Sequence, residues 1–207
     1  MTEEEARELL GVPRETVDRI SAFVDLLIAE NERQNLVSRG TLGSTWSRHV
    51  LDSAQLTRFA PAGGNWLDLG SGAGFPGLIV AVAWEGRVTL IESRKLRVEF
   101  LRAGAEVLGI SDSAEIICGS VESTTPKPFD VISARAFAPL DKLLRLALPF
   151  STAETVWILP KGRNAKSELD AARSSWQGDF RVEPSLTDAD AGIIVARGVK
   201  PKGNKGR

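Results

Sequence analysis

The sequence predicts an α/β fold in which a largely parallel sheet is covered by helices on both sides. From Asn65 onward, short apolar runs typical of buried strands alternate with segments of helical periodicity. A glycine-rich turn, residues 68–77, follows the first of these strands. The two last strands, 180–185 and 192–199, have no helix between them and therefore form a hairpin or an antiparallel edge.

Composition limits the class of protein. The chain has 207 residues, of which 43% are hydrophobic, enough for one sizeable core plus an appendage. We expect a helical extension over residues 1–60, a sheet domain over 61–199 and a basic, disordered tail over 200–207. A single cysteine, Cys118, argues against a disulfide framework or a cysteine metal cluster, and we expect no metal. Without a membrane-length apolar stretch, and with an acidic N-terminus, we expect a cytoplasmic protein.

The expected extension contains three helices. Thr2 and Glu5 have capping-box spacing for a short first helix that ends near Gly11. Pro13 opens a longer helix with apolar residues at helical spacing, and a third helix is expected around residues 45–59. We expect these helices to pack on the later sheet.

The remaining elements of the sheet domain follow in order. A buried helix is expected directly after the glycine turn, at residues 78–83. We further expect strands at 87–92, 114–118, 130–134 and 155–159, and helices at 94–108, 140–148 and 164–176. With the first strand and the final pair, this makes a seven-stranded sheet.

The glycine turn is compatible with two classes of ligand. Residues 72–77 satisfy G-x-G-x-x-G, the string of dinucleotide-binding folds, although this match alone has little specificity. The wider set, Asp68 followed by Gly70, Gly72 and Gly74, resembles the first motif of class I S-adenosylmethionine-dependent methyltransferases, whose Rossmann-like sheet also has seven strands. A turn without any ligand rarely needs so many glycines. The turn therefore favours an adenosine-bearing cofactor.

The carboxyl ends of the parallel strands are where ligands bind in such a sheet. Glu92 ends the second strand, where a carboxylate can accept both ribose hydroxyls of an adenosine. Glu122 follows the third strand, where adenine is commonly held, and Arg135 follows the fourth. The alternative for Glu92 and Glu122 is an ordinary exposed acid without a ligand. The alternative for Arg135 is a salt bridge.

The residues after the fourth strand narrow the chemistry. Enzymes that methylate exocyclic amines carry an Asp/Asn-Pro-Pro-aromatic tetrad at this position. Residues 133–137 read Ser-Ala-Arg-Ala-Phe, which argues against that reaction. Cys118 lies in a predicted buried strand without a Pro-Cys pair, and His49 has no G-x-S-x-G serine to activate, so covalent catalysis has no candidate. Methyl transfer to a ring nitrogen such as guanine N7 needs mainly orientation. Arg135 is then a candidate for holding a phosphate or guanine O6.

A combination of motifs resembles one family. The motifs are Asn35-Leu36, Arg48-His49-Val-Leu-Asp52-Ser53, the turn Asp68 to Gly77, Glu92-Ser-Arg-Lys-Leu-Arg97, Ala134-Arg135-Ala136 and Lys161-Gly162. Over roughly residues 20–200 the chain resembles the ribosomal RNA small subunit methyltransferase G family, also called glucose-inhibited division protein B. The resemblance implies N7 methylation of a single guanosine near the decoding centre of 16S rRNA, with S-adenosylmethionine as methyl donor.

The resemblance also implies roles for individual residues. The cofactor contacts expected from the motif and the family are Asp68, Gly70, Gly72, Gly74, Phe75, Glu92 on the ribose, Val121, Glu122 and Arg135. Asn35, His49 and Asp52 are expected on the substrate side, and Lys161 beside the methyl-transfer cleft. Arg135, Lys161 and His49 are the catalytic candidates, although a single histidine is more often a core or capping residue.

Two segments depart from the family pattern. Family members often carry a basic residue just ahead of the last strand, where this chain has Asp188-Ala-Asp190-Ala-Gly192, and Leu159-Pro160 stands where a Gly-Pro pair precedes Lys161. A basic C-terminal segment with no acid, from Arg197 onward, is a substitute contact for RNA phosphates. We expect a monomer whose partner is 16S rRNA or the 30S subunit. A 2′-O or small-molecule methyltransferase, or a non-catalytic RNA-binding module, are the alternatives.

Overall fold

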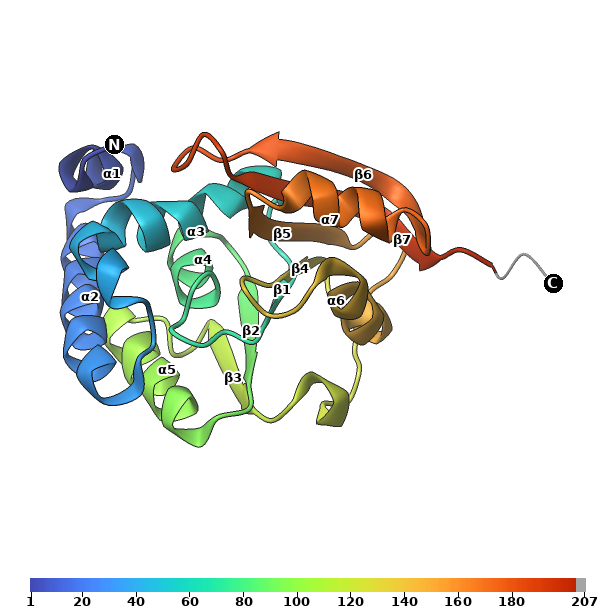
Figure 1. Ribbon diagram of the computed structural model, residues 1–207. Helices are drawn as coiled ribbons and strands as arrows, with labels where there is room; N and C mark the ends of the chain where they lie inside the picture. Colours follow the sequence, from blue (N-terminus) through green and yellow to red (C-terminus); the bar gives the residue numbers. More distant parts are fainter. Residues whose placement is uncertain (204–207) are drawn as a thin grey trace.

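The computed structural model describes residues 1–203 and contains a seven-stranded sheet flanked by helices (Figure 1). The strand order is β3-β2-β1-β4-β5-β7-β6. The first five strands pair in parallel, whereas β7 is antiparallel to both β5 and β6. The predicted α/β class is confirmed, including the antiparallel final pair. The strands are β1 (Asn65–Leu69), β2 (Arg87–Glu92), β3 (Ala114–Cys118), β4 (Val131–Ser133), β5 (Val156–Gly162), β6 (Trp176–Pro184) and β7 (Gly192–Pro201).

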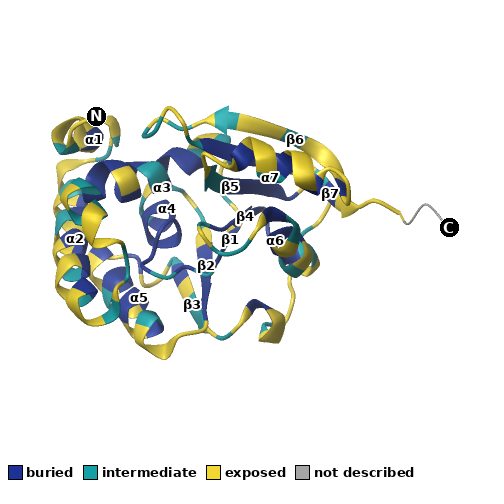
Figure 2. Cartoon of the chain, viewed as in Figure 1, coloured by how far each residue is buried: buried dark blue, intermediate teal, exposed yellow. Residues whose placement is uncertain are grey.

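Each face of the sheet buries its own core because side chains alternate along a strand. Trp66 and Leu90 lie in one core together with residues of α2 (Arg14–Gln34), α4 (Gly77–Ala83) and α5 (Lys95–Leu108). Leu67 and Ile91, one position further along, lie in the other core with α6 (Leu140–Ala147) and α7 (Ala165–Ala172). Figure 2 shows the buried residues concentrated along the strands and on the inner sides of these helices. Both faces are therefore covered, as parallel pairing requires.

The N-terminal extension differs from the prediction in its third helix. α1 (Glu3–Leu9) has the expected capping box, and α2 is the expected long helix. Residues 39–59 instead form short segments: η1 (Arg39–Ser44), the π-helical η2 (Trp46–Leu51), α3 (Asp52–Ala54) and η3 (Gln55–Phe59). Serine and threonine hydroxyls along this stretch donate to carbonyls three or four residues earlier, for example Ser53 to His49 at 2.6 Å. Such bonds compete with regular helix hydrogen bonding.

The C-terminal boundaries also differ from the prediction. α7 ends at Ala172 instead of near residue 176, and Trp176 opens β6 because its buried indole donates to Asp141 at 2.8 Å. β7 extends to Pro201, and the Lys202 N–H donates to the Ser175 carbonyl at 2.8 Å. The first two residues of the predicted tail, Lys200 and Pro201, therefore belong to β7, and residues 204–207 lie outside the described part of the chain. Within residues 1–203, no helix combines the length and the apolar character needed to cross a membrane.

Candidate active site

Two cavities lie at the carboxyl ends of the parallel strands. The larger, called the large cleft, has a volume of about 1000 Å³ and takes its walls from the segment after α2, from η2, from the end of β5 and from the loop between β6 and β7. The smaller, called the small cavity, has about 230 Å³ and lies between Gly70, the end of β2 and residues 119–122. Phe137 and Ala138 line both cavities. Their loop, the β4–α6 loop of residues 134–139, therefore separates the two.

The glycine turn after β1 adopts backbone conformations that L side chains rarely adopt. The φ angles of Gly70, Gly72 and Gly74 are +67°, +54° and +85°. A Cβ on Gly70 would also collide with the Phe137 ring, so the absence of a side chain there makes room for the β4–α6 loop. Of the turn residues, Gly70 lines the small cavity, whereas Gly72, Gly74 and Phe75 line neither cavity.

The Asp68 carboxylate points into the protein and holds the turn. It has no exposed surface, and its oxygens accept from the Ser133 hydroxyl at 2.8 Å and the Gly77 N–H at 3.2 Å. Ser133 in turn accepts from the Trp66 indole at 2.8 Å. Burial raises the pKa of Asp68 to about 6, and these hydrogen bonds oppose the shift only in part. In this conformation the carboxylate does not reach a cavity, so its predicted contact with the cofactor needs a rearrangement.

Glu92 likewise bonds to the chain itself. Its buried carboxylate accepts from the Gly72 N–H at 3.0 Å and from the Arg94 N–H at 2.9 Å, and Arg97 lies 3.9 Å away. Glu92 thereby ties the glycine turn to the end of β2. The Ser93 hydroxyl lies 3.5 Å from the oxygen that accepts from Arg94, so both carboxylate oxygens already face donors of the chain. Ribose binding by Glu92 stays a prediction.

The small cavity is the candidate site for the adenosine part of the predicted cofactor. Ile91, Val121 and Leu146 supply apolar walls, and Glu122 supplies an exposed carboxylate. Apolar walls suit a flat purine, and a carboxylate can accept from its exocyclic amine. Gly70, Val121 and Glu122 are thus the cofactor candidates that the structure gathers around this cavity. Arg135 lines the large cleft instead.

Arg135, His49 and Asp52 form one cluster at the floor of the large cleft. The Arg135 guanidinium lies 3.1 Å from Nδ1 of His49 and 3.7 Å from the Asp52 carboxylate. Phe75 lies beneath both partners: the His49 ring stacks on it with centroids 5.1 Å apart, and the guanidinium carbon lies 5.2 Å from its centroid. The structure therefore brings Arg135 to two residues of one short segment, His49 and Asp52, that lie more than 80 positions earlier in the sequence.

The hydrogen bonds around His49 define its tautomer. Arg135 can only donate, so Nδ1 of His49 is the acceptor and the proton sits on Nε2. Nε2 then donates to the Thr41 hydroxyl at 2.9 Å, and Thr41 donates to the Ser38 carbonyl at 2.7 Å. Burial lowers the pKa of His49 to about 4, and the charges of Arg135 and Arg48 add to this shift. His49 is therefore neutral at pH 7, with both ring nitrogens engaged.

Asp52 is held by the C-terminal part of the chain. Its Oδ1 accepts from Gln55 at 2.8 Å and from Thr187 at 2.8 Å, and Ser185 lies 3.5 Å away. Thr187 and Ser185 follow β6, so the antiparallel hairpin fixes the partner of Arg135. Sequence spacing offers no signal for a contact across 135 residues.

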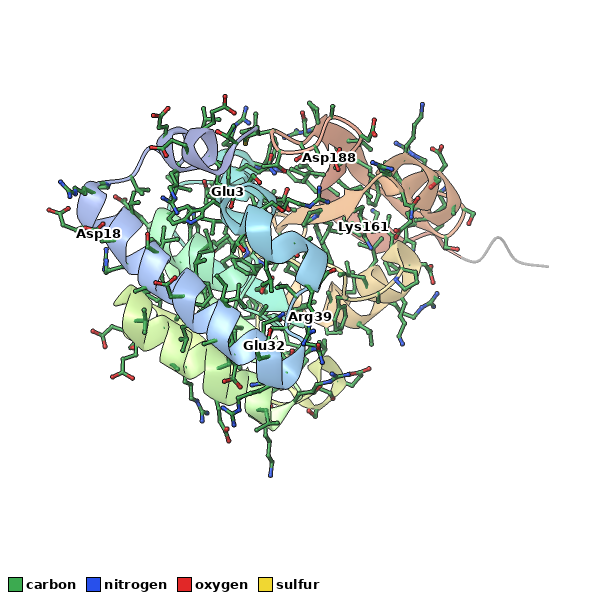
Figure 3. The ribbon with its side chains drawn as sticks, turned by 60° about the vertical axis from the view of Figure 1, so that its left-hand side comes forward. Glu3, Asp18, Glu32, Arg39, Lys161 and Asp188 are labelled. Atoms are coloured by element: carbon green, nitrogen blue, oxygen red, sulfur yellow. The ribbon has the colours of Figure 1, made fainter. Side chains whose placement is uncertain are left out.

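Lys161, at the end of β5, is anchored to the β4–α6 loop. Its ammonium donates to the Ala138 carbonyl at 2.7 Å and lies 3.0 Å from Glu168. Glu168 also accepts from the Leu140 N–H at 2.8 Å. Figure 3 shows Lys161 on the same side of the molecule as Asp188, and both line the large cleft. Lys161 thus touches the cleft, but its charge is engaged within the protein.

Two further predicted positions lie elsewhere. Asn35 is the exposed residue that ends α2, with φ +50°, while the next residues, Leu36 to Ser38, line the large cleft. Cys118 is exposed, not buried as predicted, because it ends β3 at the edge of the sheet. It lines a third cavity together with Thr89. Phe137, Thr41 and Glu168 also line the large cleft, although no motif in the sequence marks them.

Comparison with known proteins identifies relatives over the whole chain. Residues 16–192 match the family model described as rRNA small subunit methyltransferase G. A curated protein of that name from Rhizorhabdus wittichii is 53% identical over 214 aligned residues, covering 100% of this chain and 99% of the relative. A protein of the same name from Zymomonas mobilis is 50% identical and covers 99% of this chain and 98% of the relative.

Solved structures resemble the fold at low identity. An O-methyltransferase from Bacillus cereus, in complex with SAH, superposes with a TM-score of 0.56 and 16% identity over 85% of this chain and 90% of its own. A TehB-like SAM-dependent methyltransferase from Corynebacterium glutamicum has a TM-score of 0.58 and 16% identity over 82% and 97%. The fold is that of class I S-adenosylmethionine-dependent methyltransferases, and by its sequence the chain belongs to the rRNA small subunit methyltransferase G family.

Proposed function

We propose that this protein transfers the methyl group of S-adenosylmethionine to N7 of a single guanosine in 16S rRNA. Membership in a methyltransferase family whose curated relatives carry the name ribosomal RNA small subunit methyltransferase G supports an rRNA substrate. We place the enzyme in the cytoplasm as a monomer that acts on the small ribosomal subunit.

The proposal for N7 rests on the polar side chains of the cleft floor, which form hydrogen bonds and ion pairs with one another. His49 has no free lone pair on its ring, and the Asp52 carboxylate accepts from Gln55 and Thr187 through Oδ1 while its Oδ2 faces the Arg135 guanidinium at 3.7 Å. Neither residue is poised to remove a proton. Guanine N7 has an exposed lone pair and loses no proton on methylation, so the reaction needs alignment of nucleophile and donor. The bound donor supplies an activated methyl group on a sulfonium.

The two cavities suggest a division of roles. We assign the adenosine part of the donor to the small cavity, near Val121 and Glu122, and the guanosine to the large cleft. Arg135 lies at the β4–α6 loop between them and its guanidinium is fixed by Asp52 and His49. We assign Arg135 the role of fixing this boundary. Lys161 holds the same loop from its other end.

The competing 2′-O reaction requires removal of a hydroxyl proton. A lysine near the acceptor would serve, and Lys161 is the lysine that lines the large cleft. Its ammonium is bound to Glu168 and to the Ala138 carbonyl, so it is held within the protein and does not face an acceptor hydroxyl in the cleft. The geometry therefore favours N7 over a ribose hydroxyl.

The experiment is transfer of tritium from labelled S-adenosylmethionine to small subunits that lack the modification. Nucleoside analysis of the rRNA is expected to show label in 7-methylguanosine alone. Label in a 2′-O-methylated nucleoside would reject the N7 assignment. Calorimetry with S-adenosylhomocysteine and with NAD separates the methyltransferase from a dehydrogenase, because only the former is expected to bind.

A further inference from the structure

We propose that Asp188 recognises the guanine base in the large cleft through the N1–H and the 2-amino group. This inference rests on the proposed function, because it assigns the guanosine to this cleft. Asp188 belongs to the loop between β6 and β7 and is half-buried in the wall of the cleft (Figure 3). The loop contains the acidic residues Asp188 and Asp190, one of the two departures from the expected family pattern.

The states of the carboxylates in the cleft single out Asp188. Three carboxylate side chains line the cleft: Asp52, Glu168 and Asp188. Asp52 is engaged by Arg135, Gln55 and Thr187, and Glu168 by Lys161 and the Leu140 N–H. Replacing these internal bonds by bonds to a ligand would leave a half-buried cation or N–H without a partner, at a cost.

Asp188 keeps most of its hydrogen-bonding capacity. One oxygen, Oδ1, accepts from the Asp190 N–H at 3.0 Å. Among residues 1–203, no Lys or Arg nitrogen lies within 4.0 Å of this carboxylate, and its Oδ2 has no hydrogen-bond donor. The neighbouring Asp190, by contrast, pairs with Arg163 at 3.5 Å and does not line the cleft. Asp188 is therefore the carboxylate in this cleft that, among residues 1–203, has no cation beside it.

Guanine matches a carboxylate at one edge. Its N1–H and 2-amino group are two adjacent donors, and a carboxylate offers two adjacent acceptors. Adenine presents the unprotonated N1 at the same place, so the carboxylate would repel it. Recognition at this edge leaves N7, on the opposite side of the purine, free to face the donor. Asp188 would thus select guanosine without blocking the reacting atom.

The reaction strengthens this contact. The N7 lone pair forms the new N–CH3 bond while the S–CH3 bond breaks, and its electron pair stays on sulfur as a neutral thioether. The positive charge of the sulfonium thereby moves to the purine, and no proton is released. A carboxylate hydrogen-bonded to that purine binds the developing cation more strongly than the neutral base. Asp188 therefore contributes to the rate as well as to base selection.

The test compares Asp188→Asn with the matched control Asp190→Asn on unmodified small subunits. We expect Asp188→Asn to lower kcat/KM about 10- to 100-fold, the loss typical of one good bidentate base contact. Asp190→Asn is expected to leave kcat/KM unchanged, because its carboxylate faces Arg163. Affinity for S-adenosylhomocysteine is expected to be the same in both variants and in the wild type. Equal kcat/KM of Asp188→Asn and wild type would overturn the proposal.

A second measurement separates base recognition from a structural role. Small subunits reconstituted with inosine at the target position lack the 2-amino group but keep N1–H. The wild type is expected to methylate inosine about tenfold more slowly than guanosine, whereas Asp188→Asn should discriminate little between them. Full discrimination by Asp188→Asn would overturn the inference. If the wild type forms no 7-methylguanosine at all, the proposed function itself fails, which is a separate outcome.

Discussion

The residue with the most constrained chemistry in the site is His49. It lies between Arg135 and Thr41, stacks on Phe75 and is neutral because burial lowers its pKa to about 4. A protonated ring would have to place a second N–H against the Arg135 guanidinium, which can only donate. From the sequence, His49 is a candidate for a substrate-side or catalytic role, and a core or capping residue is the alternative. The contacts favour a residue that positions Arg135.

This geometry predicts a pH dependence of stability. His49 titrates near 6.5 when unfolded and near 4 when folded, so between these values the unfolded chain binds more protons. The free energy of unfolding therefore falls as pH decreases from about 6.5 to about 4, and His49 contributes about 3 kcal/mol to this loss. Urea unfolding of the wild type and of His49→Gln across this range is the measurement.

The comparison with the variant is essential because Asp68 has the opposite effect. Its pKa is raised to about 6, so its contribution to stability falls as pH increases from about 4 to about 6. Both proteins keep Asp68, and the difference between their unfolding free energies isolates His49. A difference that does not vary with pH would contradict the neutral, buried state of this ring.

At the scale of elements, the β4–α6 loop is held at both ends. Arg135 ties its start to Asp52 and His49, and Lys161 with Glu168 ties its end through the Ala138 carbonyl and the Leu140 N–H. Ala136, between these anchors, has φ +51°, a conformation that is unfavourable for alanine. The anchors hold the loop in this shape, with Phe137 against Gly70.

A double-mutant cycle on Lys161 and Glu168 tests this anchoring. Lys161→Met and Glu168→Gln are each expected to lower kcat/KM, because the loop that carries Arg135 loses one tether. Both residues act through the same ion pair. The kcat/KM of the double variant should therefore be no lower than that of the less active single variant, with a coupling energy of about 0.5–3 kcal/mol. Lys166→Met, an exposed change on α7, is the control. Additive losses would show that the two residues act separately.

The first helix also supports the site. The Glu3 carboxylate accepts from the Trp46 N–H at 2.8 Å, the Ser47 N–H at 3.0 Å and the Ser47 hydroxyl at 2.7 Å. It thereby caps η2, the segment that carries His49. The extension is therefore more than a cover for the sheet.

Glu3→Gln is expected to lower the free energy of unfolding by about 1–2 kcal/mol, the typical value of a helix cap. The amide keeps one acceptor oxygen but loses the second acceptor and the charge. Chemical denaturation of Glu3→Gln and of the exposed neighbour Glu4→Gln provides the measurement and its control. Equal losses in both variants would contradict the capping role.

At the scale of the whole molecule, two cavities share one wall. The small cavity lies on the side of β2 and β3, the large cleft lies between the extension and the C-terminal hairpin, and Phe137 borders both. Ligands in the two cavities would therefore meet at the β4–α6 loop. The extension and the hairpin, at opposite ends of the chain, must both be in place to build the large cleft.

The basic C-terminus gives a prediction at this scale. A protein ending at Gly203 keeps β7 and the bonds of Lys202, so its free energy of unfolding is expected to match that of the full chain. It lacks Lys205 and Arg207, which lie outside the described residues. If these two charges neutralise phosphates, the slope of log K against log salt for rRNA binding is less negative by about 1.4 for the shortened protein than for the full chain. Filter binding at several salt concentrations measures it, and an unchanged slope would exclude the tail from the RNA contact.

The sequence alone determined the class of this protein. Strands, helices and turns depend on local patterns, so the alternation after Asn65 and the glycine turn were sufficient to predict the α/β fold and the methyltransferase family, and both predictions are confirmed. The predicted ranges of α5, β2 and β3 were also close to those observed. The single helix predicted around residues 45–59 is instead a succession of short helical segments, because side-chain hydrogen bonds within it compete with regular helix hydrogen bonding.

Only the tertiary structure decided what the polar residues do. Asp68 and Glu92 were predicted from their motif as cofactor ligands, and the fold shows both carboxylates bonded to the glycine turn. The Arg135 cluster and the free carboxylate of Asp188 depend on contacts between segments more than 80 residues apart. Hydrogen-bond partners and burial are properties of the folded chain, and no local pattern encodes them.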